Sequence, residues 1–191
     1  MEVNIKDLEF IQLSANTALM PFHCVDDDLN NFLVEDAKNY LHDMMAVTYL
    51  FVDNGRQQIA AYFSLLNDKV AYDPQAKGVW NRINRRIHNN KRRRSYPSIK
   101  IGRLAVGEDY AKLGLGSKIL DFIKRIYATG NRAGCRFVTV DAYANATKFY
   151  QKNGFDFFTI TDALDSTRLM YFDLKPFKDA QEAAKQEQSA N

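Results

Sequence analysis

Alternating apolar and polar residues predict the strands in the first half of the chain. Residues 4–13 are expected to form a first strand, and residues 46–53 and 58–66 a second and a third. The Asn54-Gly55 dipeptide between the last two is typical of the tight turn of a β-hairpin. We therefore expect these two strands to pair in an antiparallel sheet.

Two other segments repeat their apolar residues at the spacing of an α-helix. The first follows the acidic run at 26–28, which offers an N-cap and negative charge where a helix start favours both. Its apolar stripe is Leu29, Phe32, Leu33, Ala37, Tyr40 and Leu41. The second follows a glycine-rich turn, and its buried stripe is Ile119, Leu120, Ile123, Ile126 and Tyr127, with Lys118, Asp121, Lys124 and Arg125 outside.

A strand predicted over 98–107 contains a change of phase. Its isoleucines precede the Gly102-Arg103 pair on odd positions, whereas Leu104 and Val106 follow the pair on even positions. A β-bulge produces such a shift, and a glycine at this point permits one. We therefore predict a bulge that bends this strand away from a neighbour and opens a slot in the sheet.

The second half of the chain alternates strands with helices. A β-branched strand is predicted over 136–142, a short helix over 145–153 that ends at the C-cap residue Gly154, and two strands near 155–160 and 168–174. Together the elements predict an α/β fold. Its central sheet is mixed, mostly antiparallel and contains the bulged strand, and helices flank it.

The length of 191 residues suits one domain, predicted over 1–177. Within it, residues 74–97 are expected to form an irregular helical insertion that ends at Pro97. Residues 178–191 are rich in alanine, glutamine and charge, which predicts a C-terminal tail, either a frayed helix or a disordered segment.

The composition is that of a soluble protein, with 46% apolar and 26% charged residues. No apolar run approaches the length of a membrane span, and the N-terminus does not resemble a signal peptide. We therefore expect a cytoplasmic protein with no membrane partner. The three histidines show no ligand spacing and the two cysteines cannot form a disulfide framework, so no metal site is predicted.

Positive charge is concentrated in residues 82–94, which read RINRRIHNNKRRR. This segment carries +7 in a chain of net charge +3, so the remainder is mildly acidic. The segment is either a solvated basic insertion or a surface for nucleic-acid phosphates, with His88, Trp80 and Tyr96 as further contacts. The candidate contacts are Arg85, Arg86, Lys91, Arg92, Arg93 and Arg94.

The turn at 111–117 is the strongest candidate for a binding site. Glycines at 114 and 116 remove side chains where a helix begins, so backbone N–H groups and the helix dipole are available to an anion such as a pyrophosphate. Lys112 and Lys118 are expected to add positive charge. A Gly-x-Gly turn alone is equally compatible with a connection that binds nothing.

Two motifs together carry a resemblance to a known family. Residues 101–123 read IGRLAVGEDYAKLGLGSKILDFI, which resembles the cofactor-binding segment of the GNAT N-acetyltransferase superfamily. The family pattern is Gln or Arg, two residues, Gly, one residue, and Gly or Ala after a bulged strand. Residues 146–158 read ATKFYQKNGFDFF, which resembles the family's short helix and following strand. The likeness covers 98–174 well and 4–66 more loosely, and Ala111 departs from the opening Gln or Arg.

The resemblance implies an acyltransferase that uses acetyl-CoA. In the family the cofactor lies between two splayed strands, and its pantetheine arm pairs with the backbone of the bulged strand. By position, this strand contributes Leu104, Ala105 and Val106. The pyrophosphate would bind the turn at Lys112, Leu113, Gly114, Leu115, Gly116 and Ser117, and Asn145 would be a further cofactor contact.

The resemblance also implies that Tyr150 is the general acid that meets the departing CoA thiolate. With ordinary pKa values, full proton transfer from tyrosine to a thiolate is uphill by about 2 kcal/mol. The phenol therefore has a lowered pKa or acts mainly by hydrogen bonding. Without the resemblance, a tyrosine beside Phe149 and Phe155 would be interpreted as a packing residue.

No general base is evident, because Lys100 stands where some relatives carry a glutamate and cannot replace it at an ordinary pKa. An α-amino acceptor, which titrates near pH 7.7–8.0, needs less help than a lysine amine. Residues 21–37, PFHCVDDDLNNFLVEDA, and the strand IGRLAV resemble the branch of toxins that acetylate the amino acid on charged tRNA.

Three functions therefore stay open from the sequence. The first is an N-acetyltransferase that acts on a small amine, a peptide or a protein amine. The second is a toxin-like acetyltransferase of aminoacyl-tRNA, bound through the basic segment and paired with an antitoxin. The third is a catalytically inactive GNAT-like binding module, for which Ala111 and the missing base argue.

Overall fold

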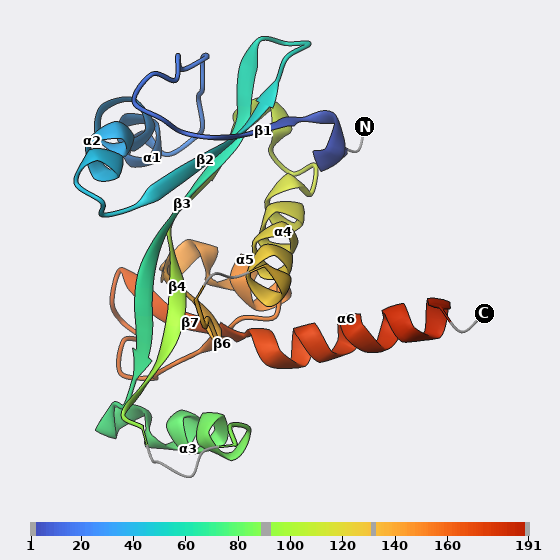
Figure 1. The fold of residues 1–191 in the computed structure, drawn as a ribbon. Coiled ribbons are helices and arrows are strands. Elements are labelled where there is room, and N and C mark those ends of the chain that lie inside the picture. The colour runs from blue at the N-terminus through green and yellow to red at the C-terminus, as the bar shows by residue number, and fades with distance from the viewer. Residues whose placement is uncertain (1–2, 89–92, 131–132, 190–191) are drawn as a thin grey trace. The chain divides into compact units, whose positions relative to one another are not determined.

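The computed structural model describes residues 3–88, 93–130 and 133–189. Their contacts define two compact units (Figure 1). Unit 1 consists of residues 1–66 and 101–122, and unit 2 of residues 67–100 and 123–191. Because two strands and one helix pass from one unit to the other, neither unit is a continuous stretch of sequence.

Unit 1 is an antiparallel sheet with helices joined to its strands. Its elements are the 3-10 helix η1 (Ile5–Asp7), strand β1 (Glu9–Gln12), helix α1 (Asp27–Asn31), the π-helix η2 (Phe32–Asp36), helix α2 (Ala37–His42), strand β2 (Val47–Asp53), the first part of β3 (Gln58–Ala71), the last part of β4 (Ser95–Val106), the 3-10 helix η4 (Glu108–Tyr110) and the start of α4 (Leu115–Thr129). The strand order is β1-β2-β3-β4. The predicted first strand is shorter than expected because Asn4 caps η1.

The predicted hairpin between β2 and β3 is confirmed, with Phe51 opposite Ala61 in an antiparallel register. Its connection is a four-residue turn, and the left-handed residue is Gln57 (φ 53°), not Gly55. The turn is fixed by Asp53, whose carboxylate accepts a hydrogen bond from the Arg56 N–H at 3.0 Å. The dipeptide thus predicted the position of the turn, and a local side-chain contact determines its geometry.

The core of unit 1 joins the predicted helical stripe to the sheet. Phe32, Leu33 and Ala37 are almost fully buried together with Leu50 and Tyr62. The hydroxyl of Tyr62 donates to the carbonyl of Leu29 at 2.6 Å, which ties α1 to β3. Burial of this apolar surface is the main source of stability for such a layer.

Unit 2 surrounds strand β5 (Phe137–Tyr143). The other elements are the end of β3, the 3-10 helix η3 (Pro74–Ala76), helix α3 (Lys77–Arg85), the start of β4, the end of α4, the 3-10 helix η5 (Ala144–Ala146), helix α5 (Thr147–Lys152), strands β6 (Asp156–Phe157) and β7 (Thr167–Asp173), and helix α6 (Leu174–Ser189). Strand β5 pairs with β7 antiparallel, with Val140 opposite Met170. The strand order is β3-β4-β5-β7-β6.

The α/β class with a mostly antiparallel sheet and flanking helices is confirmed. The basic insertion, however, does not extend to Pro97, because β4 begins at Ser95 and contains this proline. The carbonyl of Pro97 accepts from the Arg136 N–H at 2.9 Å, so the residue without an N–H still contributes to the sheet. Helix α6 begins at Leu174, before the predicted tail, and extends to Ser189.

Burial along β4 differs from the predicted phase change. Ile99, Ile101 and Ala105 are buried and share one phase across Gly102, while Leu104 and Val106 are half-buried. The glycine has a different role here, since a Cβ on it would lie 2.8 Å from the Leu66 side chain. The bulge itself stays a prediction.

In the described part of the chain, no helix is long and apolar enough to cross a membrane. The same residues hold no cluster of three or more potential metal ligands. Cys24 is buried and Cys135 is half-buried, and both are free thiols. Burial raises the pKa of the Cys135 thiol to about 11, so it is not a reactive thiolate at neutral pH.

The N-cap of α1 provides a test of the unit 1 helices. The Asp26 carboxylate accepts hydrogen bonds from the N–H groups of Asp28 at 3.0 Å and Leu29 at 3.4 Å. Asp26→Ala is therefore expected to lower the free energy of unfolding by about 1 kcal/mol, measured by chemical denaturation. Asp27→Ala, which removes only a charge of the first turn, is the control and should cost less; equal losses would contradict the capping role.

Candidate active site

The turn between β4 and α4 lies at the surface of unit 1. Lys112 and Gly114 both have left-handed backbones, with φ of 62° and 79°. For glycine this conformation carries no steric cost, whereas for Lys112 it is uncommon and is held by the surrounding turn. A Cβ on Gly114 would have no atom within 4 Å, so the turn is open at this point.

The first turn of α4 presents backbone donors. Lys118 makes the first bond of the helix, from its N–H to the Gly114 carbonyl at 3.2 Å. The N–H groups from Gly114 to Ser117 donate to none of the residues that the structure describes, whereas the Leu113 N–H donates to the Tyr110 carbonyl at 3.4 Å. Free N–H groups at a helix start form a site for an anion. The predicted set of amides is therefore available except for that of Leu113.

The two lysines beside this turn differ in what they contact. Lys112 is exposed, so its ammonium is available to a ligand at the turn. The Lys118 ammonium instead donates to the Val3 carbonyl at 2.8 Å, which ties the N-terminal segment to α4. Ala111 is exposed and offers no polar side chain where the family pattern has Gln or Arg.

A polar network beneath the turn holds its position, and sequence patterns gave no sign of it. Tyr110 is 3% exposed, and its hydroxyl donates to the Asp53 carboxylate at 2.7 Å and accepts from the Gln58 amide at 3.1 Å. These partners lie in the β2–β3 hairpin, far away in the sequence. The hydrogen bond from Tyr110 is the main cause that lowers the pKa of Asp53. The network thus links the hairpin to the turn.

The candidate strand residues are adjacent to the turn in unit 1. Ala105 is 3% exposed, and Leu104 and Val106 are half-buried. The neighbouring Arg103 lies over the Phe32 ring at 5.0 Å and has its guanidinium 3.7 Å from the Asp28 carboxylate. This end of β4 is therefore packed against α1 by an arginine whose role the sequence did not reveal.

Tyr150 and Asn145 belong to unit 2, on α5 and η5. Tyr150 is 7% exposed and lies edge-on to the rings of Phe149 at 5.1 Å and Phe155 at 5.4 Å. Its hydroxyl has no hydrogen-bond partner among the described residues. Burial raises the pKa of Tyr150, so the phenol is protonated at every physiological pH. Asn145 is exposed.

Lys124 contradicts the prediction that it faces solvent. It is 7% exposed, and its ammonium donates to the Asn153 carbonyl at the end of α5 at 2.6 Å. The same ammonium lies over the Phe172 ring at 4.3 Å. A cation at a helix C-terminus is stabilised by the helix dipole. Lys124 thereby fixes the helix that carries Tyr150.

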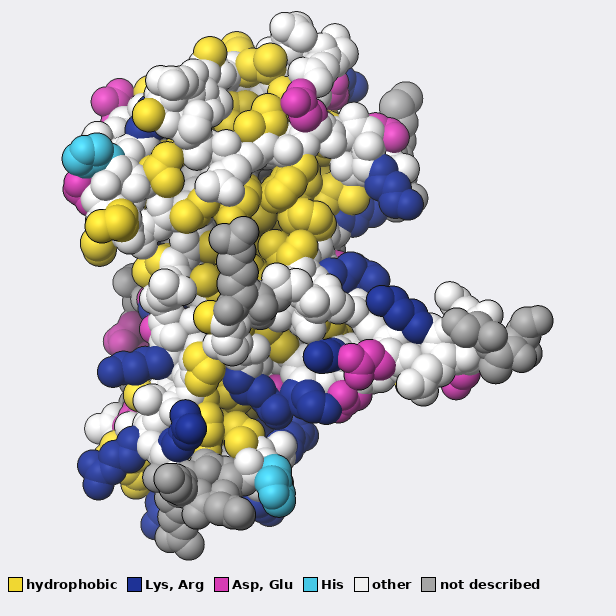
Figure 2. Space-filling view, viewed as in Figure 1, with side chains coloured by type: hydrophobic (Ala, Val, Ile, Leu, Met, Phe, Trp, Pro, Cys, Tyr) yellow, Lys and Arg dark blue, Asp and Glu magenta, His cyan; other side chains and the backbone are white. Residues whose placement is uncertain are grey.

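The arginines of the basic segment differ in what they contact. Arg82 donates to the Tyr171 hydroxyl at 2.8 Å, whereas Arg85, Arg86, Arg93 and Arg94 are exposed. The predicted contacts Lys91 and Arg92 lie outside the described residues. Lys and Arg side chains gather around α3 (Figure 2).

The aromatic residues near this segment are not those predicted. Trp80 and Tyr96 are each 5% exposed and stack at 5.4 Å, so they are core residues and not platforms for bases. Tyr72 is 40% exposed and lines a hollow of about 690 Å³ together with Lys77, Arg85 and Arg93. The arrangement combines positive charge with one accessible ring.

The chain is similar in sequence to a family of acetyltransferases and in fold to known toxins. Residues 66–156 match the profile of the acetyltransferase (GNAT) domain family. No curated protein matches the chain by sequence. At 15–18% identity the solved structures below establish the fold alone, and they confirm the predicted GNAT-like fold.

Three of these structures are of toxins or their complexes. The first is a bacterial toxin (TM-score 0.74, 15% identity, 92% of this chain and 95% of that chain covered). The second is a variant of the toxin AtaT bound to the C-terminus of the antitoxin AtaR and acetyl-CoA (0.67, 17%, 89% and 95%). The third is AtaT complexed with acetyl-methionyl-tRNAfMet (0.68, 18%, 90% and 98%).

The Tyr110 network predicts a pH-dependent stability. Because the folded protein lowers the pKa of Asp53, the carboxylate stabilises the fold above its ordinary pKa of about 3.9, and this contribution is lost as the pH falls through the lower folded value. Tyr110→Phe is expected to lower Tm at pH 7, with a smaller deficit below about pH 4. Tyr40→Phe, an exposed tyrosine, is the control. A deficit that stays constant with pH would contradict the assigned hydrogen bond.

Proposed function

We propose a reaction for this chain, which carries a GNAT acetyltransferase domain and uses acetyl-CoA as its co-substrate. The α-amine of an aminoacyl-tRNA attacks the thioester carbonyl directly, the C–S bond breaks, and Tyr150 meets the departing thiolate. The observation that carries this proposal is the buried, protonated phenol of Tyr150, which has no hydrogen-bond partner among the described residues and stands at the position of the family's catalytic tyrosine.

The raised pKa of Tyr150 decides how it acts. A phenol whose pKa lies above its ordinary value is a weaker acid, so full proton transfer to a thiolate is less favourable than for an ordinary tyrosine. The same phenol is always protonated and can donate a strong hydrogen bond to sulfur as negative charge develops. We therefore assign Tyr150 as a hydrogen-bond donor that stabilises the thiolate. The attacking nitrogen releases its proton to water, and the thiolate takes up a proton from water after it leaves.

The proposed contacts with the pyrophosphate and the pantetheine arm belong to unit 1. The N–H groups from Gly114 to Ser117 bind the pyrophosphate, and Lys112 adds charge beside them. The backbone from Leu104 to Val106 binds the pantetheine arm, and Asn145 is a further contact. Since Leu113 already donates to Tyr110, its amide supports the turn and does not bind phosphate.

The acceptor is assigned from charge and chemistry. The exposed arginines around α3 provide a surface for the phosphates of tRNA. An α-amine titrates at about 7.7–8.0, so a useful fraction is neutral at cellular pH without a strong base. The similar structure of AtaT complexed with acetyl-methionyl-tRNAfMet supports the same acceptor class. By the same likeness, we propose an antitoxin as the protein partner.

Turnover with acetyl-CoA against charged tRNA, peptides and small amines tests the acceptor. We expect transfer to charged tRNA at a kcat/KM far above that for the other amines. Acetyl transfer only to small amines or peptides would contradict the assignment of tRNA as the acceptor. Calorimetry with acetyl-CoA tests the inactive alternative, which requires that the cofactor does not bind.

Tyr150→Phe tests the catalytic assignment. We expect kcat to fall by about 100-fold, since the donor to the leaving thiolate is lost. The Kd for acetyl-CoA, measured by calorimetry, should stay nearly unchanged. Tyr40→Phe is the matched control, because Tyr40 is an exposed tyrosine of α2. An unchanged kcat in Tyr150→Phe would remove the role.

Arg85→Ala combined with Arg93→Ala tests the tRNA surface. Binding of charged tRNA is expected to weaken steeply with salt, and each lost phosphate contact should reduce the slope of log K against log salt by about 1. Lys38→Ala on α2 is the control and should leave the slope unchanged. A slope that is the same in all three proteins would rule out this surface.

A further inference from the structure

A cavity of about 280 Å³ lies in unit 2, among the ends of β3 and β4 and the strands β5 and β7. It has a polar side and an apolar side. The polar side includes Asp68, Lys100 and Asp141, and the apolar side includes Tyr72, Phe158 and Tyr171. The cofactor turn and Tyr150 do not line it.

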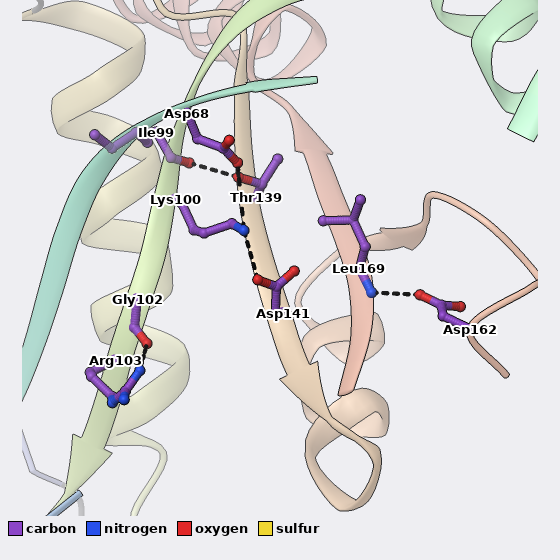
Figure 3. A network of polar contacts seen from close by, with 9 residues as sticks. All are labelled: Asp68, Ile99, Lys100, Gly102, Arg103, Thr139, Asp141, Asp162 and Leu169. Carbon is purple, nitrogen blue, oxygen red and sulfur yellow. Dashed lines mark hydrogen bonds and ion pairs between the residues drawn. The ribbon is translucent and has the colours of Figure 1, made fainter. Parts of the chain in front are cut away.

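The polar side is an ammonium held between two carboxylates (Figure 3). The Lys100 ammonium donates to the Asp141 carboxylate at 2.6 Å and lies 3.9 Å from that of Asp68. Asp68 is oriented by the hydroxyl of Thr139, which is 2% exposed and donates to it at 2.6 Å. Because the cluster is half-buried and not sealed, a ligand can reach it.

The contacts of the cluster leave two carboxylate oxygens free to accept hydrogen bonds. Each contact that the described residues make with Asp68 and Asp141 uses one carboxylate oxygen, Oδ2, and these residues donate no hydrogen bond to the other. An Asp141 side chain that is 50% exposed can turn this oxygen toward the cavity. Two carboxylates that already hold one ammonium are suited to hold a second or to exchange it.

The apolar side fits the body of an amino acid. Val70, Phe158 and Tyr171 are each no more than 5% exposed and form a fixed wall. Tyr72 at the rim is 40% exposed and presents a ring to the cavity. An apolar or aromatic side chain gains from contact with such a wall, while its amine stays beside the carboxylates.

We propose that this cavity binds the aminoacyl end of the acceptor, with the α-ammonium at Asp68 and Asp141 and the side chain against the apolar wall. The proposal rests on the proposed acetyl transfer to an α-amine. A free α-amine titrates at about 7.7–8.0, and two neighbouring carboxylates raise this pKa, so the cavity binds the ammonium, and the amine attacks the thioester only after it has lost this proton. Lys100, which stands where some relatives carry a glutamate, then competes with the ammonium of the ligand for the two carboxylates.

Binding of a small probe tests the cavity without the reaction. The probe is L-phenylalanine methyl ester, which has a free ammonium, and N-acetyl-L-phenylalanine methyl ester is its neutral counterpart. We expect NMR titration to detect the first and not the second. Asp68→Asn and Asp141→Asn should each weaken binding by about tenfold or more, and Asp165→Asn, an exposed aspartate of a loop, should not.

Lys100→Met distinguishes this role from a merely structural one. Removal of the competing ammonium frees both carboxylates, so the probe should bind more tightly than to the native protein. If the cluster only holds the strands together, this variant weakens the probe as the aspartate variants do. Thermal unfolding of each variant identifies any that do not fold. Weaker binding to a folded Lys100→Met protein, or equal binding of both esters, would overturn the proposal.

Turnover separates this inference from the proposed function. With charged tRNA as acceptor, Asp68→Asn and Asp141→Asn should raise the acceptor KM by about tenfold while the KM for acetyl-CoA stays the same. If the native protein acetylates charged tRNA but the acceptor KM is unchanged in both variants, the cavity is not the acceptor site. If the native protein acetylates no charged tRNA, the proposed function fails, and with it the assignment of this cavity to an aminoacyl group.

Discussion

The reversal of the chain between β4 and α4 is the constraint on which the proposed cofactor site depends. Two left-handed positions, at Lys112 and Gly114, turn the chain so that a helix starts with its N–H groups exposed. The conformation persists because Tyr110 is buried beneath it and hydrogen-bonded to the β2–β3 hairpin. The proposed anion site therefore depends on a hydrogen bond that would not contact the anion itself.

In unit 2, burial of Tyr150 is the corresponding constraint. Among the rings of Phe149 and Phe155, Tyr150 keeps its proton, and its hydroxyl has no hydrogen-bond partner among the described residues. The helix that carries it is short, and its C-terminus is held by the buried ammonium of Lys124. The aromatic surroundings that suggest simple packing are also what keeps the phenol protonated, as its proposed role requires.

Some charged residues of unit 2 bind other residues of the unit, whereas others are exposed to a ligand. Arg82 and Arg136 are used within the unit, by Tyr171 and by a close pair with Asp173. The exposed arginines around α3 form the proposed tRNA surface, and the Lys100 cluster lines the cavity proposed for the acceptor amine. The two features would recognise the two ends of one ligand class, a polyanion and the amine that it carries.

The sequence by itself determined the α/β class, the helix after the turn at 114–116, the β2–β3 hairpin and the candidate Tyr150, because each depends on local spacing or on a contiguous motif. Only the tertiary structure decided that Lys124 is buried, that Trp80 belongs to the core and that Lys100 lies between two aspartates. Such facts depend on partners from distant strands, and periodicity carries no information about which strands become neighbours.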